Sequence, residues 1–92
     1  MTTTVAGLVT PHLLRIVELA NSAQNGANVD WHVRDAVAKT MGVLGDQANA
    51  THLIDAYLEG LDYAVAQAAT GRTAYTSVLR AAADTVRRLR RD

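Results

Sequence analysis

The amino-acid sequence predicts an all-α fold, a compact bundle of three to four helices that forms a single domain over residues 1–92. Apolar residues recur at intervals of three and four in four segments, which is the period of an amphipathic helix. No segment shows the apolar and polar alternation of a strand, and 92 residues are too few for a second core. The predicted helices cover residues 11–24, 31–44, 47–70 and 74–91.

Cap and turn residues delimit the first two predicted helices. Pro11 follows Thr10, and proline suits the first helical position because its missing N–H needs no partner there. We therefore expect residues 1–9 to form a flexible or loosely docked arm. Residues 25–28 (Asn-Gly-Ala-Asn) predict a turn, since Asn and Gly tolerate positive φ. The second helix is then expected to start at an Asp30 cap.

The third predicted helix, over residues 47–70, is the longest and has a very broad apolar arc, which indicates a central helix with several neighbours. Small residues recur in it every four positions: Ala56, Gly60, Ala64 and Ala68. Glycine costs about 0.5 to 1 kcal/mol relative to alanine inside a helix, so Gly60 favours close approach of another helix. That helix belongs to the same chain, at Ala81–Ala83 or Ala36, or to another subunit.

The formal net charge of zero conceals an acidic body and a basic tail. Residues 1–71 hold three basic and seven acidic residues, whereas residues 72–92 hold six basic and two acidic residues. An acidic row lies on one face of the third predicted helix, and the arginines of the fourth lie away from its apolar stripe. We predict that these two clusters meet, within one chain or between chains.

Trp31 lies about 160° from the core residue Val33 on a helical wheel, which places it off the apolar stripe of its helix. Exposed tryptophan is typical of binding hot spots. The alternative interpretation is a local lid over the turn at residues 25–28. The predicted interface comprises Trp31, Asp55, Glu59, Gly60, Asp62, Arg80, Arg87, Arg88 and Arg91.

The sequence offers little chemistry for catalysis or metal binding. It has no cysteine, and no two of its three histidines are spaced as metal ligands on one helix. No Gly-X-Ser-X-Gly motif and no phosphate-binding glycine loop occurs. We therefore predict a non-enzymatic protein without cofactor or metal. The absence of a signal peptide and of a long apolar run favours a cytoplasmic protein that does not bind membranes.

These observations predict a protein–protein interaction or assembly module, a subunit of a homo-oligomer or of a larger assembly. Eight arginines against one lysine, with abundant alanine, are typical of GC-rich coding and favour a phage or actinobacterial source. The alternative is a small nucleic-acid-binding protein. Residues 37–43 resemble the first helix and turn of a helix-turn-helix protein, although an acidic helix follows them. In this alternative the phosphate-binding residues are Arg87, Arg88, Arg90 and Arg91.

Overall fold

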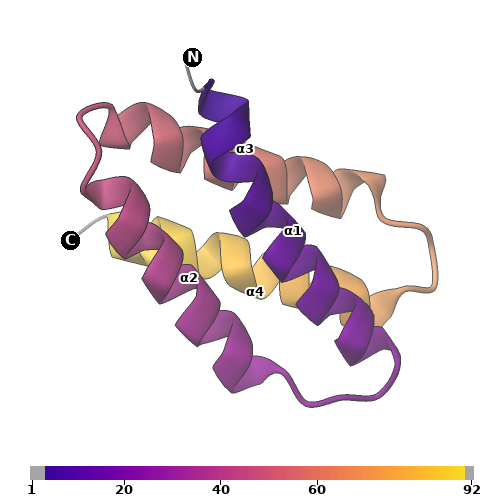
Figure 1. The fold of residues 1–92 in the computed structure, drawn as a ribbon. Helices are drawn as coiled ribbons and strands as arrows, with labels where there is room; N and C mark the ends of the chain where they lie inside the picture. Colours follow the sequence, from indigo (N-terminus) through magenta and orange to yellow (C-terminus); the bar gives the residue numbers. More distant parts are fainter. Residues whose placement is uncertain (1–3, 91–92) are drawn as a thin grey trace.

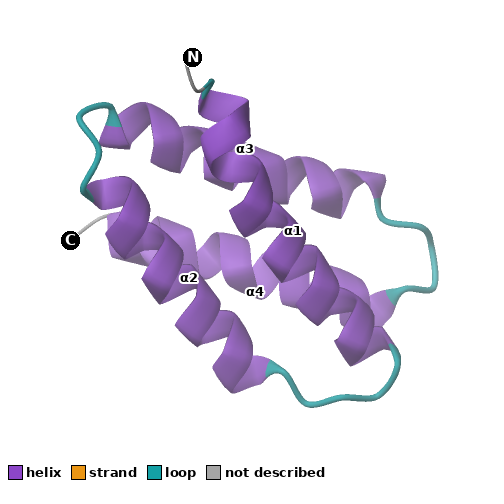
Figure 2. Ribbon diagram, in the orientation of Figure 1, coloured by secondary structure: helices purple, strands orange, loops and turns teal. Residues whose placement is uncertain are grey.

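The structure, a computed structural model, describes residues 4–90, and these form four α-helices without any strand (Figure 2). The helices are α1 (Val5–Gln24), α2 (Asp30–Gly45), α3 (Ala50–Gln67) and α4 (Thr73–Arg90). The antiparallel pair α1 and α2 lies across the antiparallel pair α3 and α4 (Figure 1), and each helix contacts the other three. The prediction of an all-α bundle is confirmed, with four helices in the described part of the chain.

The first helix begins at Val5, six residues before the predicted start at Pro11. Thr4 caps this helix, because its hydroxyl accepts a hydrogen bond from the backbone N–H three residues later at 3.0 Å. Val9 is only 2% exposed and belongs to the core. The predicted loose arm is therefore a docked helical segment from Val5 onward, and residues 1–3 of that arm lie outside the described residues.

The turns before α2 and α4 each contain a glycine in the left-handed region. Gly26 has φ 101°, as expected for the predicted turn at residues 25–28, and Gly71 has φ 94°. The third helix ends at Gln67, so it is shorter than predicted, and α1 with 20 residues is the longest helix within residues 4–90. Asp30 is the first residue of α2 rather than its cap.

The core is formed by apolar side chains from all four helices. Helix α4 contributes five buried residues and α3 only three. Helix α3 contacts all three other helices, as its broad apolar arc predicted, but the sides of that arc are only partly covered, so α3 is not the most buried helix. Leu61, at the middle of that arc, is 1% exposed. Within residues 4–90, no helix combines the length and the apolar character that crossing a bilayer requires.

Candidate interaction surfaces

The acidic row of α3 and the arginines of α4 meet within the chain. The Arg87 guanidinium donates from Nη2 to both carboxylate oxygens of Asp62, at 2.8 and 2.7 Å, and Nη1 lies 3.2 Å from Asp84 Oδ1. One turn further along α4, Arg90 Nη2 lies 2.5 Å from Asp55 Oδ1. These side chains are roughly half exposed, so each pair contributes about 0 to 1 kcal/mol. Their main effect is to neutralise two arginines and two aspartates.

The other charged residues of the predicted interface do not join this network. Glu59 is exposed, and within residues 4–90 it forms no ion pair. Arg80 is also exposed and lies near the loop between α3 and α4. Arg88 lies about 100° around the helix from Arg87, and its Nη2 donates to Thr85 Oγ1 at 3.2 Å. Arg91 lies outside the described residues.

Gly60 marks the crossing of α3 with α1. A Cβ atom added at Gly60 would lie 2.6 and 2.9 Å from the two Cδ atoms of Leu13. The close approach expected for Gly60 therefore exists, but the neighbour is α1 rather than the Ala81–Ala83 or Ala36 segment. Because Leu13 already occupies this space, Gly60 serves the internal packing of the bundle.

Trp31 is exposed in the first turn of α2. Its exposed fraction is 69%, and its ring meets the His32 ring edge to face with centroids 5.3 Å apart. This exposure favours the outward interpretation over the local lid. Tyr63 on α3 is 67% exposed and provides a comparable aromatic side chain on a different helix.

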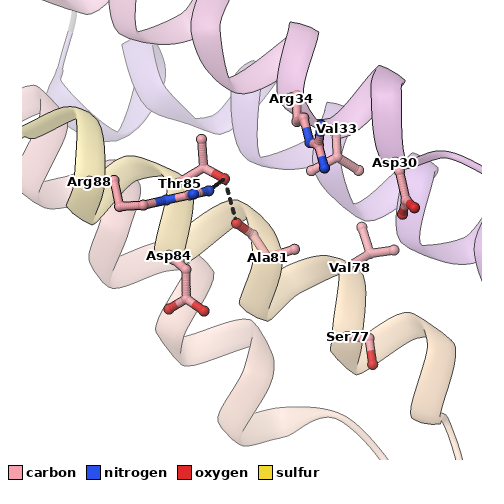
Figure 3. A pocket seen from close by; sticks show the side chains of 9 residues that line it. All are labelled: Asp30, Val33, Arg34, Ser77, Val78, Ala81, Asp84, Thr85 and Arg88. Carbon is pink, nitrogen blue, oxygen red and sulfur yellow. Dashed lines mark hydrogen bonds between the residues drawn. The ribbon is translucent and has the colours of Figure 1, made fainter.

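A groove runs between α2 and α4 and encloses a hollow of about 640 Å³ (Figure 3). It is lined by Asp30, Val33, Arg34, Ser77, Val78, Ala81, Asp84, Thr85 and Arg88. A second hollow of about 510 Å³, lined by Arg34, Ala38, Thr85, Arg88 and Leu89, continues it towards the end of α4. Val33 and Val78, 3% and 8% exposed, form an apolar floor. Sequence reasoning missed this groove and its residue Arg34.

A small polar cluster lies inside the bundle where α1, α2 and α3 meet. Thr40 Oγ1 lies 3.0 Å from His12 Nδ1, and the His12 and Tyr57 rings pack edge to face at 6.5 Å. Burial raises the pKa of Tyr57 to about 12, and the nearby Thr40 hydroxyl offsets part of this rise. Within residues 4–90, no group satisfies the geometry of a hydrogen bond to the Tyr57 hydroxyl. The buried hydroxyl without a hydrogen-bond partner therefore lowers the stability of the folded state.

The histidines do not form a metal centre in the described part of the chain. His12 and His32 both line a hollow of about 220 Å³ between α1 and α2, whereas His52 on α3 does not. No group of three or more His, Asp or Glu side chains within residues 4–90 could hold a metal ion. His12, the second residue of the helix predicted at 11–24, is the eighth residue of α1 because that helix starts earlier than predicted.

Comparison of the chain with protein families, with curated proteins and with solved structures found no match. Its function is therefore argued from the surfaces described above.

Proposed function

We propose that this chain is a non-enzymatic protein–protein interaction module that acts as a subunit of a homo-oligomer or of a larger assembly. The observation that carries the proposal is Trp31, which leaves 69% of its surface exposed on the outer side of α2. Burying roughly 150 Å² of a tryptophan against a partner contributes about 4 kcal/mol at about 25 cal/mol per Å². A single side chain of this kind can anchor an interface.

Two other large apolar side chains of the α1–α2 layer support the proposal. Leu14 on α1 is 56% exposed and Val43 on α2 is 50% exposed. In Figure 1, α1 and α2 lie side by side in front of α3 and α4, and no helix of residues 4–90 covers their outer side. On α2, Lys39 Nζ lies 2.9 Å from Asp35 Oδ2, so this pair needs no further partner. The layer thus offers exposed apolar side chains beside an ion pair that is already compensated.

Oligomeric state tests the proposal directly. Light scattering or sedimentation over a range of protein concentrations should show the wild type associating, because Trp31 is buried against a second copy or subunit. The Trp31→Ala variant should dissociate at concentrations where the wild type stays assembled. Tyr63→Ala is the matched control, since it removes an equally exposed aromatic from α3. A wild type that remains monomeric at every concentration, or equal effects of the two variants, would contradict the proposal.

The nucleic-acid alternative has less support from the geometry. Arg87 and Arg90 are held by Asp62 and Asp55, so fewer cations are available for phosphates. Gly42, expected in a turn between two helices, lies inside α2. If the alternative holds, a DNA duplex should bind at low salt and weaken steeply as salt rises, with a slope of about 0.9 per phosphate contact.

A further inference from the structure

We infer that the α2–α4 groove binds an acidic, amphipathic helix of a partner protein, through carboxylates that pair with Arg34 and Arg88. The inference rests on the proposed function, because it names a partner class for a protein-binding module. Trp31 precedes Arg34 by three residues, which places the two side chains on neighbouring parts of the α2 surface. A helix in the groove would lie beside the exposed tryptophan.

The shape of the groove suits a helix. On α4 its lining extends from Ser77 to Leu89, a separation of twelve positions and hence about 18 Å, which equals about three turns of a docked helix. Its floor is apolar, and Leu89, which is 41% exposed, extends the apolar lining at one end. An amphipathic helix places apolar residues over such a floor and polar residues over the rims.

The charges on the rims of the groove determine whether the partner helix should be acidic or basic. Arg34 on α2 and Arg88 on α4 both line the two hollows. Within residues 4–90 neither arginine has a carboxylate at ion-pair distance, whereas Arg87 and Arg90 on the other side of α4 are both paired. Two arginines that line one groove from different helices form a site for carboxylates, which arginine can bind in a bidentate manner.

The two aspartates of the groove do not cancel this preference. Asp84 is paired with Arg87, and in Figure 3 its carboxylate points away from α2. Asp30 lies in the first turn of α2, where its charge complements the helix dipole, and one turn before Arg34. The Arg34 and Arg88 end of the groove is therefore the positive end. A phosphate backbone is a poorer occupant, because two arginines beside an apolar floor neutralise few phosphates.

A pair of synthetic peptides tests whether the groove prefers an acidic or a basic helix. Both have about 18 residues, are blocked at the termini and carry leucines at i, i+3, i+4 and i+7. Glutamates flank the leucines in one peptide and lysines in the other. In fluorescence anisotropy with the full chain, the glutamate peptide should bind at least about tenfold more tightly than the lysine peptide. The Arg34→Glu, Arg88→Glu double variant should reverse this preference.

The control is Arg80→Glu, which changes an exposed arginine of the same helix outside the groove and should alter binding by less than about threefold. Circular dichroism checks that each variant folds. If the double reversal does not fold, the Arg34→Gln, Arg88→Gln protein should bind both peptides equally. The inference is overturned if the wild type does not distinguish the peptides, if Arg80→Glu acts as strongly as the double variant, or if a DNA duplex binds more tightly than either peptide. Self-association that depends on Trp31, without any binding of the glutamate peptide, would refute the inference and leave the proposed function standing.

Discussion

The contact between Gly60 and Leu13 gives a stability prediction whose sign depends on the neighbour. Gly60→Ala gains about 1 kcal/mol of helix propensity, but its Cβ would lie 2.6 Å from one Leu13 Cδ atom and 2.9 Å from the other. Relieving such overpacking typically costs about 1 to 3 kcal/mol. We expect a net loss of about 0 to 2 kcal/mol in the wild-type background. In a Leu13→Ala background the obstacle is absent, and the same substitution should stabilise by about 1 kcal/mol.

A double-mutant cycle measured by urea unfolding and circular dichroism isolates this term. The coupling between Gly60→Ala and Leu13→Ala should be about 1 to 3 kcal/mol, whereas residues without contact add almost independently. Gly42→Ala is the matched control, because Gly42 lies in α2 with nothing within 4 Å of the added Cβ, and it should stabilise by about 1 kcal/mol. If Gly60→Ala stabilises as much as Gly42→Ala, Gly60 is not required by close packing.

Three further predictions concern the core and the α3–α4 ion pairs. Leu61→Ala, at a residue 1% exposed, should destabilise by about 2 to 5 kcal/mol in thermal unfolding, and an unchanged melting temperature would contradict its place in the core. Because burial raises the pKa of Tyr57 to about 12 in the folded protein, against 10.0 for an unburied tyrosine, stability should hold below pH 10 and fall by up to about 3 kcal/mol between pH 10 and 12. Tyr57→Phe should abolish that fall and, by removing the unpartnered hydroxyl, stabilise by about 1 kcal/mol at neutral pH; an alkaline transition as large as in the wild type would refute this. Reversing Arg87, Arg88 and Arg91 to Glu should leave helicity largely intact while changing association rate or oligomer geometry, and wild-type assembly at both low and high salt would show that these arginines do not orient assembly.

The number and order of the helices could be predicted because periodic apolar spacing is a local signal that tertiary contacts reinforce. The start of α1 could not be predicted from Pro11 alone. Thr4 and Thr10 are both possible caps, and the choice depends on whether Val9 can be buried, which the other helices decide. The extent of α3 was overestimated at both ends: the helix starts at Ala50 and ends at Gln67, because Ala68 already has an extended backbone.

The candidate site was only partly accessible to sequence reasoning. Exposure of Trp31 follows from its angle on one helix, and so does the outward position of the acidic row. Arg34 and Arg88 line the same groove from two different helices, so their proximity depends on how α2 and α4 cross. Periodicity along one helix contains no information on the crossing angle between two helices. The same limit explains why Gly60 was predicted to contact α4 or α2 rather than Leu13.

Ion pairing between α3 and α4 also has a kinetic consequence. Along the chain the charges form two poles, but folding places Arg87 and Arg90 against Asp62 and Asp55, so part of this charge separation is neutralised in space. A protein with zero formal net charge and reduced charge separation has a weak long-range field. We expect the rate constant for association with a partner to be about 10⁵ to 10⁶ M⁻¹s⁻¹, without the acceleration that electrostatic steering gives. Partners would then differ in how slowly their complexes dissociate rather than in how fast they associate.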